Sequence, residues 1–157
     1  MLAFADAHLD IAWSSLANGR DFVAGHPDAA LGLPDLLRGG VTLACTTVFT
    51  AKHDEDETPA EVADQQLAYY DALPARSGGK VIWPADVMDV GTCTPGDRVC
   101  LTGLIEGCEP LSKVEDLKPL YKRGVRVVGL TWNRKNRWAG GCESDAGLEE
   151  EGRELVT

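Results

Sequence analysis

The segment Arg98–Trp132 reads RVCLTGLIEGCEPLSKVEDLKPLYKRGVRVVGLTW, in which two apolar stretches flank a polar one. Both apolar stretches are rich in the β-branched and aliphatic residues that favour strands. Between them, Ser112 can cap a helix, Glu115 completes the capping pattern, and Gly124 can end the helix. Pro119 predicts a kink or two shorter turns there, because proline lacks the N–H that a helix interior needs. The segment therefore predicts a strand, a crossover helix and a second strand.

The same alternation of strands and helices extends through the rest of the chain. Apolar periodicity, β-branched runs and capping residues predict, in chain order, a strand over Leu2–Ile11, a short helical turn in LPDLLRGG stopped by its two glycines, a buried strand over Val41–Phe49, a helix capped by Thr58 and ending near Pro74, a short strand over Lys80–Trp83, and a helix that begins in GLEEEGRELVT. Repeated strand, helix and strand indicate a parallel β-sheet built from βαβ units.

The chain supplies about four such units in 157 residues. A closed (β/α)₈ TIM barrel needs eight strands and typically about 250 residues, so this chain would form only its first half. A complete small open α/β sheet is the alternative. With 44% hydrophobic residues, the chain can bury one core, and we expect a single domain over residues 1–157.

Charge and cysteine usage exclude several classes of partner. The formal net charge of −10 repels phosphate backbones and anionic membrane surfaces, and the basic run NRKNRWAG is too short to reverse this. No secretion-type leader and no apolar run of about 18 residues is visible, so neither nucleic acid nor a membrane is expected as a partner. Five cysteines without a C-x-x-C pair are typical of free thiols in a reducing cytoplasm.

Polar residues interrupt the first predicted strand in ADAHLDIAW (Ala5–Trp13). His8 and Asp10 project to the same face because successive strand side chains alternate. They lie at the carboxyl end of the strand, where parallel α/β folds place their active sites. An imidazole nitrogen and a carboxylate oxygen can together bind a divalent ion, and a histidine hydrogen-bonded to a neighbouring aspartate without metal is the alternative.

Glu106 ends its strand in the same way that Asp10 ends the first one, and Gly107 lets the backbone turn away from a crowded site. A carboxylate at the end of a mostly apolar strand needs a partner, because burial of an isolated charge is costly. A cation shared with His8 and Asp10 is one such partner. A salt bridge to an arginine, such as Arg126 or Arg134, is the other.

These residues carry a resemblance to a known family. DAHLDIAW resembles the D-x-H-x-D opening of the renal or membrane dipeptidases, the M19 metallopeptidases. The segments LPDLLRGGV, GLIEG, LKPLYKRGVRVVGLTWNRKNRWAGG and GLEEEGREL are similar to later blocks of that family, in the same order. The resemblance runs from about Asp6 to the last residue, and the ordered blocks together are more specific than any one of them.

The resemblance implies a TIM barrel of the amidohydrolase kind with two zinc ions, which hydrolyses dipeptides. His8 and Asp10 would hold the first zinc ion, and Glu106 would bridge both ions and so take part in catalysis by the water shared between them. In the block LTWN, Trp132 stands where many members have a substrate-polarising histidine, although other members also carry LTWN. Trp132 and Asn133 are the substrate-binding residues expected from this block.

The resemblance also implies that part of the site lies outside this chain. In the family, two histidines of the second metal site and an acidic residue that handles the proton of the catalytic water lie in the second half of the barrel. His26 and His53, in polar turn-like surroundings, are expected to be exposed loop residues. We therefore expect this apparently truncated chain to bind at most one zinc ion and to have negligible dipeptidase activity alone.

Two further functions fit the sequence. A half-barrel leaves its first and last strands as unpaired apolar edges, so the chain could be a non-catalytic interaction module that associates with itself, as a homo-oligomer, or with a partner that supplies the missing carboxyl-terminal half. Another metal-dependent hydrolase of the amidohydrolase type, acting on a lactone, amide or cyclic urea, is also compatible with the H-x-D pair alone.

Overall fold

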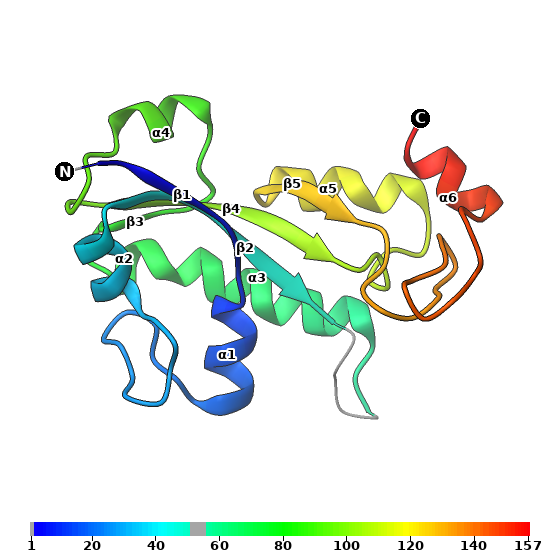
Figure 1. Cartoon of the computed structure of the whole chain (residues 1–157), viewed down its shortest axis with the longest axis horizontal. Helices are drawn as coiled ribbons and strands as arrows, with labels where there is room; N and C mark the ends of the chain where they lie inside the picture. The colour runs from blue at the N-terminus through cyan, green and yellow to red at the C-terminus, as the bar shows by residue number, and fades with distance from the viewer. Residues whose placement is uncertain (1, 51–55) are drawn as a thin grey trace.

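The computed structural model describes residues 2–50 and 56–157, so His53 lies outside the described residues. A parallel β-sheet forms its centre (Figure 1). Its strands are β1 (Phe4–Leu9), β2 (Val41–Phe49), β3 (Val81–Ile82), β4 (Val99–Glu106) and β5 (Val125–Gly129). The helices are α1 (Ile11–Asn18), α2 (Leu33–Gly39), α3 (Pro59–Arg76), α4 (Val87–Thr92), α5 (Leu117–Lys122) and α6 (Glu150–Leu155), with a 3₁₀ turn, η1 (Val114–Asp116), before α5.

The strand order shows which α/β architecture the chain adopts. β1 pairs with β2, β2 with β4, and β4 with β5, all in parallel and in chain order. The two-residue β3 pairs only with the first residues of β4, on the edge that β5 occupies further along. A doubly wound sheet would reverse its strand order at a switch point, whereas a TIM barrel adds strands in sequence. The predicted arc of four barrel strands is therefore confirmed.

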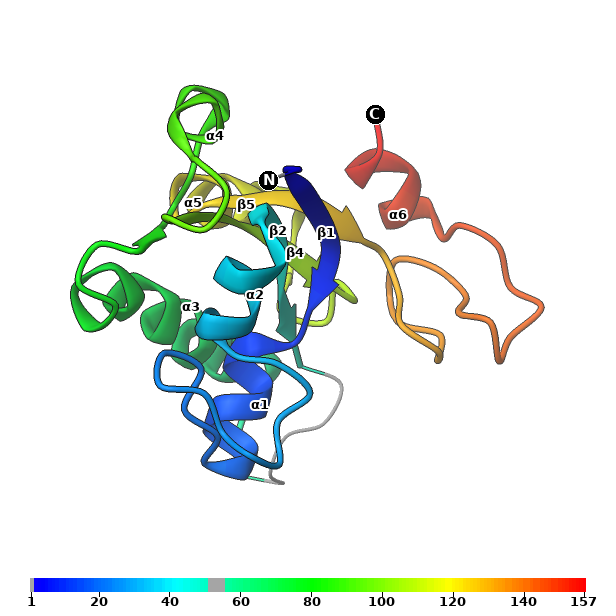
Figure 2. The same ribbon diagram turned by 60° about the vertical axis from the view of Figure 1, so that its left-hand side comes forward.

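The hydrophobic core lies between this sheet and the helices that cover one of its faces. Helices α1, α2 and α3 all pack against β2 (Figure 2). Ala44 and Val48 of β2 are fully buried beneath Leu67 and Leu73 of α3. This burial explains the β-branched, nearly continuous apolar character of β2, which is the pattern of a parallel strand covered by helices.

Two polar side chains of α3 hold the carboxyl end of β2. The buried Tyr70 hydroxyl donates to the carbonyl oxygen of Thr47 at 2.6 Å and accepts from the N–H of Ala12 at 3.1 Å. The Gln66 amide donates to the carbonyl oxygen of Phe49 at 2.5 Å and accepts from its N–H at 2.9 Å. These bonds fix the end of β2 relative to the start of α1, and both segments border the site described below.

Helix α1 was not predicted, and the strand expected over residues 2–11 ends at Leu9. The apolar run continues through Ile11 and Ala12, but its period changes there from that of a strand to that of a helix, and both residues are buried. Gly19 ends the helix in the left-handed conformation, at φ 63°. The six-residue α4 was also missed, although Asp86 caps it by accepting from two backbone N–H groups.

The segment with Pro119 divides into η1 and α5, so the predicted pair of shorter turns is confirmed. Pro119 is the third residue of α5, where an N–H would have no partner within the helix. Ser112 does not cap through Glu115 as expected. Its N–H and hydroxyl both donate to the carboxylate of Asp116 instead, at 2.9 and 2.7 Å. The last predicted strand is also shorter, because β5 ends at Gly129 rather than continuing through Trp132.

We predict that Tyr70→Phe destabilises the protein by about 1–3 kcal/mol, because it leaves the N–H of Ala12 and one buried carbonyl without their partner. Urea unfolding followed by circular dichroism measures the loss. Tyr69→Phe is the matched control, since the Tyr69 hydroxyl donates to the partly exposed Ser15, and its loss should not exceed about 1 kcal/mol. Equal losses in the two variants would contradict the structural role assigned to Tyr70.

Candidate metal centre

Three side chains expected at strand ends from the sequence converge in the structure. His8 lies near the end of β1, Asp10 follows that strand directly, and Glu106 is the last residue of β4. Nε2 of His8 lies 3.6 Å from Oδ1 of Asp10 and 3.6 Å from Oε1 of Glu106. One ligand atom from each residue lies within 4.8 Å of the other two. The predicted constellation is therefore assembled, and its role as a metal site stays a prediction.

The curvature of the sheet is what brings these groups together. β2 lies between β1 and β4, so the backbones that carry His8 and Glu106 are two strand spacings apart, about 10 Å. Side chains on a flat sheet would keep that separation. On the concave side of a barrel arc they point toward one another, and the three polar groups meet in front of the end of β2.

The distances suit a cation better than direct hydrogen bonds. Hydrogen bonds between nitrogen and oxygen are about 2.7–3.2 Å long, shorter than either contact of His8 with its carboxylate neighbours. Tetrahedral zinc with ligands at about 2.0–2.2 Å separates its ligand atoms by about 3.3–3.6 Å. The two distances from Nε2 of His8, each 3.6 Å, match that separation, and all three ligand atoms lie within 4.8 Å of one another. One imidazole nitrogen with two carboxylate oxygens is also a donor set that zinc accepts.

Thr47 of β2 orients Asp10. The Thr47 hydroxyl donates to Oδ1 of Asp10 at 2.6 Å. Asp10 stands at the N-cap position of α1, but its side chain accepts no hydrogen bond from the helix backbone. Its carboxylate is thus directed toward His8 instead of capping the helix. The sequence did contain a signal for Thr47. Because successive side chains of a strand alternate, residues 47 and 49 of β2 lie on the same face, and that face ends at the site.

The electrostatics of Glu106 also favour a cation. Burial raises the pKa of its carboxyl group, His8 lowers it, and the nearby carboxylate of Asp10 raises it further. The net direction is upward, so the ionised form is disfavoured in the fold. A bound cation would offset both the burial and the repulsion between the two carboxylates.

The arginine alternative for Glu106 does not occur. Arg126 lies over the ring of Tyr121 and donates to the carbonyl oxygen of that residue at 2.6 Å. Arg134 is 3.8 Å from the carboxylate of Glu143. Within residues 2–50 and 56–157, His8 is the only ion-pair partner of Glu106.

Aromatic side chains form one wall of the site. A cavity of about 290 Å³ is lined by His8, Asp10, Trp13, Phe49, Glu106 and Trp132. The ring of Phe49 stands edge-on between those of Trp13 and Trp132, with centroid distances of 6.2 and 5.0 Å. Trp132 therefore lines a cavity beside the three candidate ligands, and its predicted contact with substrate stays a prediction.

Asn133, the other expected substrate residue, lies outside the lining found among the described residues. Its side-chain oxygen is 3.5 Å from Sγ of Cys142, and its backbone carbonyl accepts from the N–H of Glu143. These contacts place Asn133 within the loop that follows β5. Its predicted contact with substrate stays a prediction.

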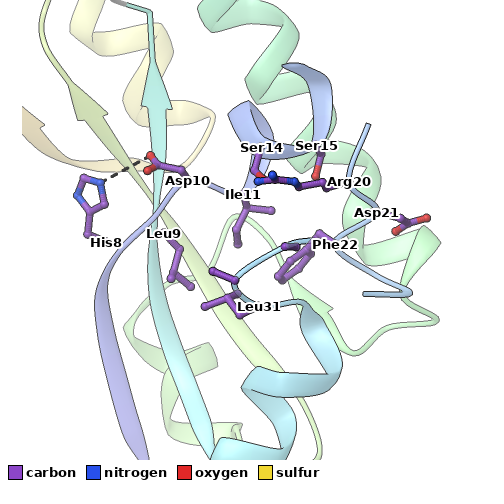
Figure 3. A pocket seen from close by; sticks show the side chains of 12 residues that line it. His8, Leu9, Asp10, Ile11, Ser14, Ser15, Arg20, Asp21, Phe22 and Leu31 are labelled. Carbon is purple, nitrogen blue, oxygen red and sulfur yellow. Dashed lines mark ion pairs between the residues drawn. The ribbon is translucent and has the colours of Figure 1, made fainter. Parts of the chain in front are cut away.

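A second cavity, of about 240 Å³, adjoins the first and shares His8 and Asp10 with it (Figure 3). In Figure 3 these two residues lie on one side, while the Arg20 side chain runs from the other side toward Ser14 and Ser15. His26 contributes to neither cavity among the described residues. Its Nδ1 accepts from the N–H of Asp28. His26 lies in a loop as expected, but its side chain is only partly exposed, at 35%.

Residues 2–157 match the sequence model described as membrane dipeptidase (peptidase family M19). This chain belongs to that family. Its fold is similar to the crystal structure of an M19 dipeptidase, with a TM-score of 0.78 and 19% identity over 99% of this chain and 54% of that one. It is also similar to a metallopeptidase from Rhodobacter sphaeroides liganded with a phosphinate mimic of the dipeptide L-Ala-D-Ala, with a TM-score of 0.83 and 19% identity over 99% of this chain and 55% of that one.

The match to a relative found by sequence covers less of this chain than the matches to solved structures do. An uncharacterized protein in the pqqA 5′ region of Klebsiella pneumoniae is 31% identical over 84 residues, which are 53% of this chain and 31% of that protein. The chain thus spans about half the length of the solved structures that it matches and less of this relative. In the described part of the chain, no helix combines the length and the apolar character needed to cross a membrane.

We predict that Glu106→Gln raises the melting temperature of the metal-free protein at neutral pH. The pKa of Glu106 is raised by folding, so its ionisation costs stability once the pH exceeds the ordinary glutamate value of 4.5. The gain should therefore grow as the pH rises through the shifted pKa and vanish well below 4.5, where both side chains are neutral. Thermal denaturation in chelator, over a pH series, measures it.

Glu61→Gln is the control of opposite sign. Hydrogen bonds from Thr58 lower the pKa of Glu61, so its charge supports the start of α3 and the variant should melt at a lower temperature at neutral pH. A lower melting temperature for Glu106→Gln as well would show that the Glu106 carboxylate is not strained in the metal-free fold.

Proposed function

We propose that this M19 chain supplies the first half of a zinc-dependent dipeptidase site, in which His8, Asp10 and Glu106 bind the metal. The observation that carries the proposal is the convergence of these three ligand atoms within 4.8 Å. Membership of the M19 family supports dipeptides as the substrate class. Five free thiols support a reducing, cytoplasmic location.

Each ligand has a distinct task in this proposal. His8 and Asp10 would hold one ion at the end of β1, and Glu106 would be a carboxylate ligand shared with a second ion. The Thr47 hydroxyl keeps the Asp10 carboxylate turned to the ion, as outer hydrogen bonds do in metal sites. When bound, zinc polarises a peptide carbonyl and lowers the pKa of a water molecule toward neutrality.

The aromatic wall supports a small substrate. The cavity of about 290 Å³ is near the lower end of the range for small-molecule pockets, about 300–1,000 Å³. Trp132, 39% exposed, lines this cavity beside the three candidate ligands. We assign to it, with Phe49 and Trp13, the orientation of the substrate and the exclusion of water from the peptide bond.

The proposed site is incomplete within this chain. The chain has three histidines: His8 lies in the site, His26 is held in a loop by Asp28, and His53 lies outside the described residues. The chain also spans only about half of its solved relatives. We therefore propose that it binds at most one zinc ion and needs further residues for hydrolysis.

Zinc titration tests the ligand assignment. Calorimetry or competition with a chromophoric chelator should show at most one zinc ion bound per chain. We expect His8→Ala to weaken binding by at least about 100-fold, since even loss of an outer hydrogen bond typically costs about 10–100-fold. His26→Ala is the matched control and should bind like the unaltered chain. Equal weakening in both variants, or none in either, would refute the assignment.

An assay of dipeptide hydrolysis tests the proposal that the site lacks residues needed for catalysis. The zinc-loaded chain should give no hydrolysis of a simple dipeptide above the rate in buffer, and a lactone assayed in parallel covers the wider amidohydrolase chemistry. Chelator-sensitive dipeptide hydrolysis by the monomer would overturn the claim that the site is only half built.

Exposed apolar residues on the outer strands favour a second candidate, a half-barrel interaction module. Phe4 of β1 is 52% exposed, and Val127 and Val128 of β5 are 41% and 38% exposed. Within the described residues, β1 pairs only with β2, and β5 only with β4. Sedimentation of the zinc-loaded sample at several concentrations separates the candidates. A monomer throughout, without binding of a hydrophobic dye, would count against the module.

A further inference from the structure

Two cysteines lie in contact at the opposite end of β4 from Glu106. Sγ of Cys93 is 2.8 Å from Sγ of Cys100, so the two thiols are in direct contact. All five cysteines are among the described residues, and this is the only contact between sulfur atoms found there.

The backbone holds Cys100 in the sheet and leaves Cys93 accessible to solvent. Cys100 is the second residue of β4, pairs with Leu43 of β2 and Ile82 of β3, and has a fully buried side chain. Cys93 follows α4 and is partly exposed. A turn closed by the hydrogen bond from the N–H of Asp97 to the carbonyl of Thr94 brings the two together.

We propose that Cys93 and Cys100 form a reversible intramolecular disulfide by exchange with a low-molecular-weight disulfide. The Cys93 thiolate attacks one sulfur of that disulfide, which forms a mixed disulfide and releases one small thiolate. Cys100 then gives its proton to the small thiolate already released and attacks Sγ of Cys93. This releases the second small thiolate, which takes up from solvent the proton that Cys93 lost. The protein dithiol is oxidised by two electrons, and the small disulfide is reduced to two thiols.

The order of these steps follows from burial. Burial, reinforced by the hydrogen bond and the charge of Cys93, raises the pKa of Cys100 to about 12. The charge of Asp89 contributes to this rise, and that of Arg98 opposes it. Cys100 thus stays protonated until an adjacent electrophilic sulfur is present, whereas the partly exposed Cys93 meets the oxidant first.

The other three cysteines have no such partner among the described residues. Cys108 is buried, and its thiol donates to the carbonyl oxygen of Gly129. Cys142 is exposed beside Asn133, and its thiol would stop at a mixed disulfide. Cys45 is partly buried, and burial together with the charge of Asp6 raises its pKa, which slows its exchange.

The disulfide would attach the α4 segment to the sheet. Figures 1 and 2 show α4 standing apart from the layer formed by α1, α2 and α3. The link lies at the amino end of the strands, which in barrels serves stability, while the candidate metal centre lies at the carboxyl end. We therefore expect oxidation to stabilise the fold and to leave zinc binding unchanged, so this inference stands or falls apart from the proposed function.

Peptide mapping tests the link directly. The chain is incubated with glutathione disulfide, quenched in acid, alkylated under denaturing conditions and digested with trypsin. Cleavage after Arg98 places the two cysteines on different peptides, 81–98 and 99–113. We expect these peptides as a linked pair, lighter than their sum by two hydrogen atoms. Because Cys108 lies on the second peptide, fragmentation spectra must place the bond at Cys100.

Two variants distinguish a disulfide between Cys93 and Cys100 from unspecific oxidation of exposed thiols. Cys93→Ser should abolish the linked peptide, and Cys142→Ser, which removes the exposed thiol, should retain it. Oxidation should raise the melting temperature by about 5–10 °C in the unaltered chain and not in Cys93→Ser. A persistent glutathione adduct on Cys93 without the link, or an unmodified Cys93 while Cys142 carries an adduct, would overturn the inference. An unchanged melting temperature with the link present would overturn the stabilising role.

Discussion

The parallel pairing of β2 with both β1 and β4 is the constraint on which the rest of the molecule depends. Within β2, Thr47 makes hydrogen bonds on both faces of the sheet. The carbonyl oxygen of Thr47 accepts from the buried hydroxyl of Tyr70, while its own hydroxyl donates to Asp10. One residue thus ties the helix-covered face of the sheet to the ligand-bearing edge. The packing of α3 against β2 therefore sets the position of a carboxylate that belongs to another strand end.

This arrangement places two like charges close together, which is electrostatically unfavourable. Asp10 and Glu106 both direct carboxylates toward His8, a side chain that is only half buried. Burial is the main reason that the pKa of Glu106 is raised; His8 lowers it, and the neighbouring carboxylate of Asp10 raises it. A fold selected for stability alone would place an amide or an apolar group at one of these positions. A cation bound between the three side chains would offset the repulsion between the two carboxylates.

Much of this could be predicted from the sequence because the signals were local. Strand alternation put His8 and Asp10 on one face, and the apolar run before Glu106 marked its strand end. The curvature that brings these side chains together depends on packing between strands that are far apart in the chain. So does the position of the Thr47 hydroxyl beside Asp10. Helix α1 was missed because its buried first turn continues the apolar run of β1. The cysteine contact was missed because no spacing rule describes a pair joined through a turn.

The position of the core explains how this arc of barrel strands holds its shape without relying on the candidate metal centre. The buried cluster lies between the strands and α1, α2 and α3, and includes Ala44, Val48 and Leu67. On the concave face, by contrast, His8 is half exposed and Glu106 partly so. Folding free energy therefore comes mainly from the helix-covered face, since that is where apolar area leaves water. The concave face adds little to folding and carries the three candidate ligands, so the packing that stabilises the fold is separate from the candidate metal centre.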